Sequence, residues 1–331
     1  MNAKKALVCG ADGFIGHHLV NYLKQEGYWV KGIDIKINTY ARSNADTFIK
    51  GDLRNQKFCE EVIDESFDEV YQLAADMGGA GYIFVGNNDA DIMHSNVMIN
   101  LNILDVCYQR NVKNLLFSSS ACVYPAYNQL DPDTPKTSEE STYPAAPDSE
   151  YGWEKLFSER IYLSFHRCKK MNIKIARLHN IFGPEGSWND GREKSPAAIC
   201  RKIATAKNGE KIEIWGDGNQ TRSYLYIDEC LQGLRKLMNS SWTGPVNLGS
   251  EEMVTINELA KLVMKIAGKN LQLEHIPGPL GVRGRKSDNH MIKQMLGWSP
   301  SYSLKEGLEK TYLWIESQVK HNRSAQSFRP R

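Results

Sequence analysis

The stretch GADGFIG at residues 10–16 decides the fold. A short apolar run, KALVC (5–9), precedes it, and the amphipathic segment FIGHHLVNYLKQEG (14–27) follows it. A strand, a glycine turn and a helix in this order let the backbone approach a pyrophosphate, which then rests on the helix N-terminus. The sequence therefore predicts a dinucleotide-binding turn built from Gly10, Gly13, Phe14, Ile15 and Gly16.

Strand and helix patterns keep alternating beyond this turn. Apolar runs occur at YWVKGID (28–34), EVYQLAA (69–75) and NLLFSSS (114–120), and helical patterns lie over about 92–110 and 151–169. Alternation of this kind predicts a doubly wound parallel sheet of Rossmann type, with helices on both faces.

The pattern changes after residue 179. IFGPEGSWNDGREKSP (181–196) is a long, glycine-rich and charged loop of the kind that usually serves ligands. We predict a Rossmann domain over 1–178, to which segments near 223–248 return, and a smaller C-terminal α/β lobe over 179–320 that binds substrate. The last residues, 321–331, are basic and aperiodic and are expected to form a flexible tail.

The composition excludes other classes of function. The chain has 331 residues and a net charge of +2, which gives no reason to expect nucleic acid or an acidic membrane as a partner. No run approaches the ~18 apolar residues of a membrane span, and the first strand begins too early for a signal peptide. Seven cysteines without a CxxC pair and eight histidines without ligand spacing predict a cytoplasmic protein with no disulfide and no metal site.

Acidic residues beyond the glycine turn complete the predicted dinucleotide site. The second strand ends at Asp34, where a carboxylate can hold the adenosine ribose hydroxyls and would repel a 2′-phosphate. In GDLRN (51–55), Asp52 is placed to hydrogen-bond the adenine amine, and Leu53 lies beside it. The predicted cofactor is therefore NAD.

A tyrosine and a lysine four residues apart form the candidate redox pair. Tyr151 and Lys155 in YGWEK share one face of a predicted helix, and Ser120 ends the preceding strand. A phenol with a pKa of about 10 is a poor base at neutral pH, but a neighbouring ammonium and a cationic nicotinamide ring both lower that pKa. We predict that the three residues act on one substrate oxygen and that Tyr151 and Lys155 also contact the cofactor.

These motifs together resemble the extended short-chain dehydrogenase/reductase family over nearly the whole chain. The nucleotide-sugar enzymes of that family also carry a glycine-aspartate-glycine stretch before an arginine-serine-aromatic one, seen here in GDGNQTRSYLYIDE (216–229). The stretches MGGAG (77–81), SSACVYP (119–125), GREKSPAA (191–198) and GVRGRKSDN (281–289) narrow the resemblance to its NAD-dependent 3,5-epimerases, which act on GDP-mannose.

The resemblance implies an isomerase that converts GDP-D-mannose to GDP-L-galactose, with GDP-L-gulose as a C5-epimer side product. Transient oxidation at C4 makes the C3 and C5 protons acidic, Cys122 is implied as the base, and Lys194 is implied as the acid. A homodimer through the helices near 92–110 and 151–169 is also implied. The implied substrate-binding residues are Gly78, Gly79, Ser120, Ala121, Cys122, Asn180, Glu193, Lys194, Ser195, Lys202, Gly218, Asn219, Gln220, Thr221 and Arg283.

Individual residues have other interpretations. A cysteine near a strand end is often inert core, so Cys122 could serve packing alone. Trp215 could bind the nucleotide or be structural. Arg285 and Lys286 could clamp a diphosphate together with Arg283, or be solvated charges.

Alternative functions also stay open at this point. The rivals are a nucleotide-sugar 4-epimerase, a 4,6-dehydratase and a non-catalytic NAD-binding scaffold on the same fold. The 4-epimerases of the family typically have threonine where Cys122 stands, and a dehydratase would need an acidic residue near that position. A scaffold would tend to lose Tyr151 and Lys155, both of which are present.

Overall fold

The computed structural model describes residues 3–38, 40, 42–64 and 67–327. Seven strands of this part form the large sheet: β1 (Lys5–Cys9), β2 (Trp29–Asp34), β3 (Thr47–Lys50), β4 (Glu69–Gln72), β5 (Asn114–Ser120), β6 (Asn172–Leu178) and β11 (Pro245–Leu248). Their order is β11-β6-β5-β4-β1-β2-β3, and all six neighbouring pairs are parallel. The predicted doubly wound parallel sheet is confirmed.

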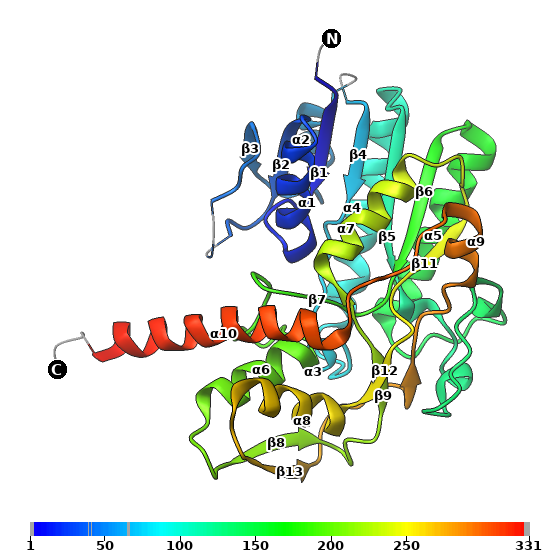
Figure 1. The fold of residues 1–331 in the computed structure, drawn as a ribbon. Coiled ribbons are helices and arrows are strands. Elements are labelled where there is room, and N and C mark those ends of the chain that lie inside the picture. The colour runs from blue at the N-terminus through cyan, green and yellow to red at the C-terminus, as the bar shows by residue number, and fades with distance from the viewer. Residues whose placement is uncertain (1–2, 39, 41, 65–66, 328–331) are drawn as a thin grey trace.

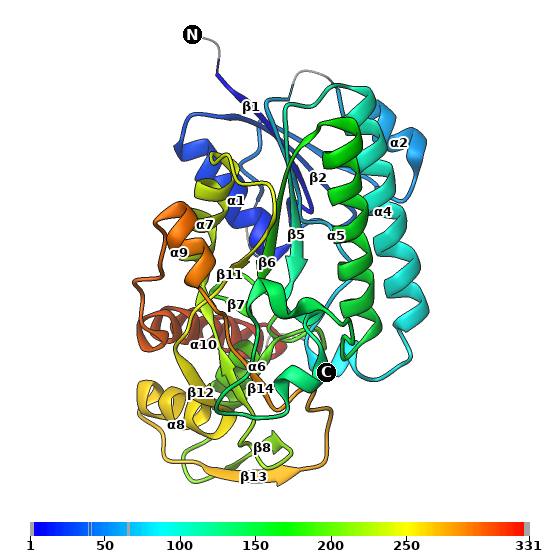
Figure 2. The ribbon, with the colours of Figure 1, turned by 90° about the vertical axis from the view of Figure 1, so that its right-hand side faces the viewer.

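Helices cover both faces of this sheet (Figures 1 and 2). On one face α1 (Phe14–Gln25) packs against α7 (Ile227–Met238). The other face carries α2 (Gln56–Val62), α4 (Asp89–Gln109) and α5 (Glu150–Lys169), with α4 and α5 side by side. The chain runs outward in opposite directions from β1 and β4, so the point between them is the topological switch where such sheets bind ligands.

The smaller lobe lies beyond the carboxyl ends of the large sheet (Figure 1). Its strands form the sheets β12-β9-β14 and β13-β8, while β10 pairs with β7. The remaining elements are α3 (Ala80–Ile83), β7 (Ile181–Phe182), α6 (Ser195–Thr205), β8 (Lys211–Trp215), β9 (Thr221–Ser223), β10 (Leu225–Tyr226), β12 (Met253–Thr255), α8 (Ile256–Ala267), β13 (Gln272–Ile276), β14 (Gly284–Arg285), α9 (His290–Leu296) and α10 (Leu304–Ser327).

The hydrophobic core joins the two lobes. The cluster under α1 and α7, which includes Val20 and Leu234, continues without a break to Ile203, Val263 and Leu308 in the smaller lobe. Helix α10 packs on α6 and α8 and then projects away from the body of the molecule (Figure 1). The shared core fixes the smaller lobe over the switch point, where a ligand would meet both.

Capping residues set where the key helices begin. Ser149 caps α5 by accepting a hydrogen bond from the Gly152 amide at 3.2 Å, and Thr255 forms a capping box with Glu258 at the start of α8. Helix α1 follows Gly13, which makes no side-chain cap. Gly13 therefore places no side chain of its own over the first amides of α1, and an anion can bind there.

Two segments differ in detail from the sequence-based expectation. The stretch 121–149, predicted as loop, contains 3₁₀ turns at Ala121–Val123, Ala126–Gln129 and Glu139–Thr142. The predicted aperiodic tail over 321–331 is helical as far as Ser327, and its last four residues lie outside the described part.

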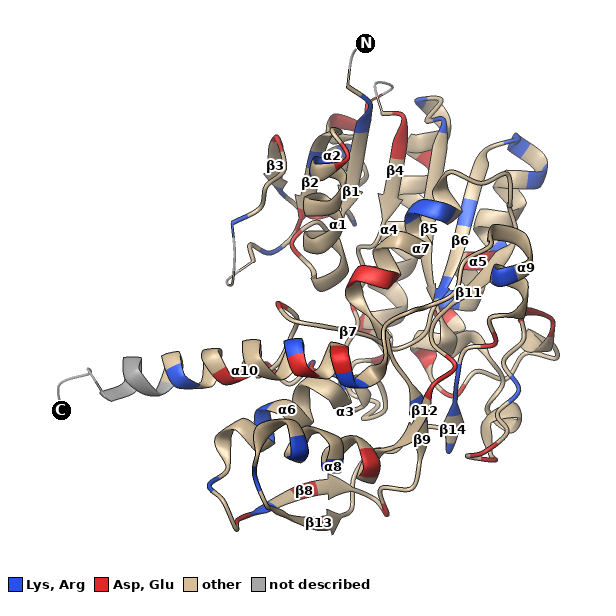
Figure 3. Ribbon diagram, in the orientation of Figure 1, with Lys and Arg blue, Asp and Glu red and all other residues tan. Residues whose placement is uncertain are grey.

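Residues of both charge signs are interspersed along the ribbon of both lobes (Figure 3). Within the described ranges no helix is long and apolar enough to span a bilayer. The same ranges contain no cluster of three or more His, Cys, Asp or Glu residues that could hold a metal ion.

Candidate active site

The turn after β1 leaves its backbone open to a ligand. Gly10 has a φ of +80°, and a Cβ there would lie 2.8 Å from the Ala74 amide nitrogen. A Cβ on Gly16 would lie 1.9 Å from the Gly10 carbonyl oxygen. Only glycine fits these two positions, which brings the start of α1 close to β1 and β4 as a dinucleotide site requires.

Asp34 is held beside this turn. Its Oδ2 accepts hydrogen bonds from the amides of Asp12 and Gly13 at 3.0 and 3.1 Å, and its Oδ1 accepts one from Lys36 at 3.0 Å. The carboxylate is fixed where the second strand ends, the position that suits adenosine ribose hydroxyls in this type of fold.

Asp52 is already bound by a neighbouring side chain. Arg54 donates to it from Nε at 3.0 Å and from Nη2 at 2.7 Å, and these hydrogen bonds lower the pKa of Asp52. The expectation of a carboxylate free for the adenine amine did not foresee this partner two residues away. Both side chains still line the cofactor cavity.

One cavity of about 460 Å³ runs from the glycine turn to the start of α6. Ser118 of β5, Lys194 and, from α10, Thr311 line its other parts. The predicted cofactor residues that line it are Gly10, Gly13, Phe14, Ile15, Gly16, Asp34, Asp52 and Leu53. The uncapped helix, the glycine cradle and the Asp34 carboxylate fit NAD.

Tyr151, Lys155 and Ser120 lie together at the end of β5. Tyr151 is 6% exposed, and the Lys155 Nζ atom lies 5.6 Å from its ring centroid. Lys155 Nζ also donates to the Ser118 carbonyl at 3.1 Å, which fixes the ammonium against the strand. Ser120 Oγ accepts the Cys122 amide hydrogen at 3.2 Å. The structure thus brings the predicted redox pair and the candidate base to one place.

The pKa of Tyr151 departs in the opposite direction from the one expected. Burial raises this pKa, the negative charges of Cys122 and Glu154 raise it further, and hydrogen bonding with Ser120 opposes them. Burial also lowers the pKa of Lys155. Desolvation outweighs the ammonium because phenolate loses its hydration in this enclosed position.

Cys122 and Lys194 approach the same place from different lobes. Cys122 lies in the 3₁₀ turn after β5 and packs in a cluster with Tyr151 and Met77. Lys194 immediately precedes α6, and burial of its ammonium lowers its pKa while the nearby Cys122 charge opposes that effect. A thiol therefore packs against Tyr151 of the redox pair, and an ammonium with a reduced pKa lies near that thiol.

The segment around α3 holds the Lys194 loop. The Gly79 amide donates to the Arg192 carbonyl at 2.9 Å, and a Cβ on Gly79 would lie 2.2 Å from the Glu193 carbonyl oxygen. Arg192 Nη1 donates to Asp76 Oδ1 at 2.7 Å, and its guanidinium lies 4.0 Å from the Tyr82 ring centroid. Gly79 thus allows a close backbone contact beside Lys194, and its predicted approach to the substrate stays a prediction.

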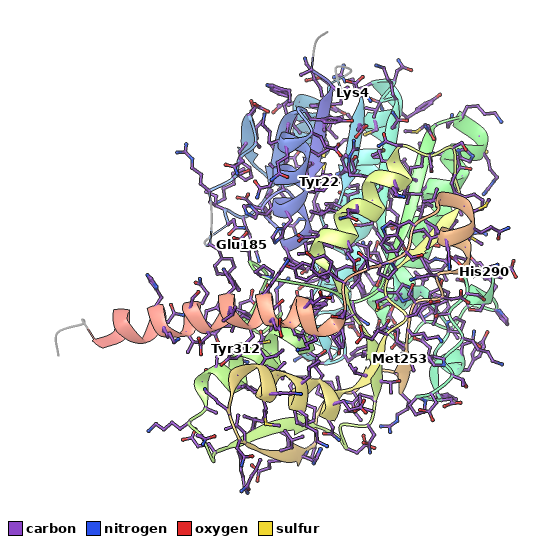
Figure 4. All side chains as sticks on the ribbon, viewed as in Figure 1. Lys4, Tyr22, Glu185, Met253, His290 and Tyr312 are labelled. Carbon is purple, nitrogen blue, oxygen red and sulfur yellow. The ribbon has the colours of Figure 1, made fainter. Side chains whose placement is uncertain are left out.

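The same loop is fastened to α1. His17 Nε2 lies 3.2 Å from Glu185 Oε2, and His18 Nε2 lies 3.1 Å from the Pro184 carbonyl oxygen. Glu185 is labelled in Figure 4 between the large lobe and α10, which carries Tyr312. The loop that bears Lys194 is therefore held from both sides of the cavity.

Other predicted substrate residues of this region make internal contacts. Asn180 Nδ2 donates to the Ser223 carbonyl at 3.0 Å, and Ser195 Oγ lies 2.7 Å from Tyr224 Oη. Glu193 Oε1 is bound by Arg201 at 2.7 Å. Lys202 Nζ donates to the Glu213 carbonyl at 2.7 Å. Each of these four side chains thus has a protein partner in the structure, and their predicted contacts with substrate stay predictions.

The stretch 216–221 joins β8 to β9 in the smaller lobe. Gly218 has a φ of +69°, and Arg283 makes a two-pronged ion pair with Asp217 at 3.0 Å, which lowers the pKa of Asp217 to about 2. Gln220 donates to the Trp215 carbonyl, while its Oε1 is buried without a hydrogen-bond partner. That oxygen is a buried acceptor of this stretch that the described side chains leave without a partner.

Sequence reasoning missed the partners that orient the site. Arg285 was grouped with Arg283 and Lys286 as a diphosphate clamp or solvated charge, but it is 6% exposed and its Nη1 lies 3.2 Å from Cys122 Sγ. The roles of Asp76 and Arg192 depend on contacts between residues more than 100 positions apart, for which a single sequence carries no local signal.

A Rossmann-type nucleotide site joined to a tyrosine-lysine pair defines an NAD-dependent oxidoreductase scaffold. The model of the NAD dependent epimerase/dehydratase family matches residues 6–249, and the chain belongs to this family. Its cofactor is NAD.

The chain is also similar to named members of the family. It is 43% identical to a GDP-mannose 3,5-epimerase of Arabidopsis thaliana over 97% of this chain and 84% of that protein. It is 42% identical to GDP-mannose 3,5-epimerase 1 of Oryza sativa subsp. indica, over 96% of this chain and 83% of that protein. A solved UDP-glucose 4-epimerase of Thermotoga maritima, with UDP-glucose, superposes with a TM-score of 0.83 at 26% identity, over 95% of this chain and 99% of that one.

Proposed function

We propose that this protein is a GDP-mannose 3,5-epimerase, an isomerase that converts GDP-D-mannose to GDP-L-galactose and releases GDP-L-gulose as a C5-epimer side product. The observation that supports the proposal is that Cys122 packs with Tyr151 and interacts with the ammonium of Lys194 from the other lobe. The similarity to the plant GDP-mannose 3,5-epimerases supports the same reaction.

The chemistry explains why a thiol and an ammonium are needed. Hydrogens on an unactivated sugar carbon are too weakly acidic for any side chain to remove, but a ketone at C4 acidifies those on C3 and C5. When bound, NAD supplies the acceptor for the C4 hydrogen as hydride and later returns it, so no net oxidation results. Inversion at the neighbouring carbons then requires proton removal on one face and proton delivery on the other.

Each residue has a defined task in this reaction. Tyr151 takes the proton from the sugar O4 and later returns it, with Ser120 donating a hydrogen bond to the same oxygen. Cys122, as thiolate, takes the proton from C3 or C5, and the carbanion is held as the enolate. Lys194 delivers a proton to the opposite face. The lowered pKa of Lys194 suits this task because a more acidic ammonium releases its proton more readily.

The rivals fit the site less well. A 4-epimerase has no use for a base and acid aimed at C3 and C5. A 4,6-dehydratase needs an acidic residue near the end of β5, where Ala121 and Cys122 stand. A non-catalytic scaffold gives no reason to bury Lys155 against Ser118 beside a tyrosine.

A homodimer and a reducing compartment belong to the same proposal. Exposed or partly exposed apolar side chains recur every four residues on α4 (Met93, Val97, Leu101) and on α5 (Trp153, Phe157, Ile161). Two adjacent helices that each present such a stripe form a surface that a second copy can cover. All seven cysteines are free, as suits the cytoplasm.

Turnover in heavy water tests the reaction without any mutation. A base and an acid that exchange with solvent should leave deuterium at C3 and C5 of the product, while C4 keeps protium because its hydrogen never meets water. NMR of the product from GDP-mannose reads all three positions. Inversion at C4 without solvent label would identify a 4-epimerase, and unlabelled C3 and C5 after full turnover would exclude the proposed function.

A further inference from the structure

Arg285 is the basic side chain that touches the candidate base. From β14, its Nη1 donates to Cys122 Sγ at 3.2 Å, its Nε donates to Gln129 Oε1 at 2.6 Å, and its Nη2 donates to Asp148 Oδ2 at 3.2 Å. Three contacts fix the plane of a rigid guanidinium. The sulfur therefore faces a donor whose position is set by two other side chains.

The contact between Arg285 and Cys122 fixes which atom donates and which accepts. A guanidinium carries donors and no acceptor, so its contact with Cys122 is a hydrogen bond only when sulfur is the acceptor. An ionised acceptor makes the stronger bond to an ionised donor. The contact is that of a sulfur acceptor, and a thiolate makes this bond stronger than a thiol does.

Buried and half-buried positive charge surrounds this sulfur. The titratable and charged side chains that interact with Cys122 are Tyr151 and Lys155 on α5, Lys194 ahead of α6, Arg222 on β9 and Arg285 on β14. Arg222 donates to the carbonyl oxygens of Leu280 and Val282, and burial together with the Arg285 charge lowers its pKa to about 10. Buried cations require an anion nearby.

Asp148 alone does not balance this charge. It binds Arg285 through Oδ2, while its buried Oδ1 has no hydrogen-bond partner. The Cys122 sulfur is the remaining group in contact with Arg285 that can carry a negative charge.

We propose that Arg285 is a positioning residue that keeps Cys122 ionised and holds its sulfur in the orientation for proton removal. The inference rests on the proposed function only for the identity of the proton that Cys122 removes. Arg285 acts through Cys122, whereas Arg283, two residues earlier, pairs with Asp217 on the outer wall of the lobe.

Alkylation of Cys122 by iodoacetamide measures its ionisation directly, since the thiolate is the reactive form. The rate is followed against pH in the NAD-bound protein without substrate, and peptide mass spectrometry separates Cys122 from the exposed Cys168. Arg285→Gln should move the midpoint of the Cys122 profile upward by about one pH unit, which is roughly tenfold slower alkylation below both midpoints. Arg285→Lys, which keeps the charge, should move it less, and the Cys168 profile should not move.

Asp148→Asn should shift the Cys122 alkylation profile in the direction opposite to that of Arg285→Gln. Removing the negative charge that pairs with Arg285 leaves the guanidinium charge less compensated, so it should move the Cys122 midpoint to lower pH. A general loosening of the site would instead move both variants in one direction. If Arg285→Gln does not fold or does not retain NAD, the alkylation profiles of Arg285→Lys and Asp148→Asn test the proposal instead. An unmoved Cys122 profile in folded Arg285→Gln, or an upward shift in Asp148→Asn, would overturn the proposal.

The same variants separate this inference from the proposed function. With GDP-mannose, Arg285→Gln should slow deuterium entry at C3 and C5 while hydride transfer at C4 continues. A shifted alkylation profile in a protein that does not epimerise GDP-mannose would leave the role of Arg285 standing and remove the proposed function. The reverse result would remove the role of Arg285 alone.

Discussion

At the scale of single residues, burial governs the chemistry of the site more than neighbouring charge does. The hydroxyl of Tyr151 and the ammonium groups of Lys155 and Lys194 all have pKa values displaced toward their neutral forms, because each is enclosed. The residue types were predictable from YGWEK and GREKSP, but the direction of the pKa shift of Tyr151 was not. Desolvation depends on what the whole fold places around a side chain.

Replacement of the tyrosine tests the first proton transfer. Tyr151→Phe removes the group that takes the O4 proton, so both epimerisations should fall by roughly 10²–10⁴-fold, the usual range for general acid-base catalysis. NAD released from the denatured protein should be unchanged in amount, because the glycine turn and Asp34 are untouched. Turnover close to that of the unmodified protein would remove Tyr151 from the mechanism.

Cys122→Ala and Lys194→Ala test the inversion step separately. Each should stop deuterium entry at C3 and C5 while oxidation at C4 continues, so reduced nicotinamide should accumulate and be visible by its absorbance. The matched control is Cys168→Ala, which removes an exposed thiol at the end of α5. If Cys122→Ala still epimerises freely, the thiol serves packing alone.

At the scale of elements, two backbone contacts that require glycine divide the site into a cofactor half and a substrate half. Gly16 lets α1 approach the turn after β1, and Gly79 lets the α3 segment approach the loop that carries Lys194. The two positions lie in different parts of the chain and hold different groups. Their effects on cofactor binding and on catalysis should therefore separate.

Gly79→Ala and Gly16→Ala form a reciprocal pair. A Cβ on Gly79 would lie 2.2 Å from the Glu193 carbonyl oxygen, so this variant should lose at least about tenfold in kcat by moving Lys194, while NAD stays bound. A Cβ on Gly16 would lie 1.9 Å from the Gly10 carbonyl oxygen, so that variant should lose NAD first. Cofactor content and kcat, measured together, check both. Equal loss of both properties in both variants would contradict the division.

The sequence predicted long periodic elements better than short ones. Helices expected over about 92–110 and 151–169 occur as α4 (Asp89–Gln109) and α5 (Glu150–Lys169). The two-residue strand β14 has no pattern of its own and exists because Gly284 and Arg285 pair with β9. The contact of Arg285 with Cys122 follows from that pairing, which is why the clamp interpretation of GVRGRKSDN did not foresee it.

At the scale of the whole molecule, the apolar stripes of α4 and α5 predict a dimer. Trp153 is 41% and Phe157 is 49% exposed on the outer face of α5, and Figure 2 shows α4 beside it. Trp153→Glu or Phe157→Glu should convert a dimer to a monomer in sedimentation velocity, because a buried unpaired carboxylate is costly. Leu130→Glu, at an exposed apolar residue outside these helices, is the control and should stay dimeric. A monomeric unmodified protein would contradict the dimer.

Acid should weaken the whole fold through His179, which joins the end of β6 to β11. This histidine is fully buried, its Nε2 lies 2.8 Å from Asn247 Oδ1, and its Nδ1 has no hydrogen-bond partner. Burial, together with the charges of Arg285 and Arg177, lowers the pKa of His179 from 6.5 to about 3. His179 is therefore protonated below about pH 6.5 in the unfolded chain but only below about pH 3 in the folded protein.

Neutral His179 therefore costs the folded protein no stability above pH 6.5, and the free energy of unfolding falls progressively as the pH drops from 6.5 toward 3. Between pH 7 and pH 5 the loss from this one group is about 2 kcal/mol. Urea denaturation at pH 7 and pH 5, at equal NAD concentration, measures the difference in the free energy of unfolding between the two pH values. In His179→Gln this difference should be smaller than in the unmodified protein by about 2 kcal/mol. His290→Gln, at an exposed histidine at the start of α9, should keep the pH dependence of the unmodified protein. If His179→Gln keeps it too, protonation of His179 does not limit stability in acid.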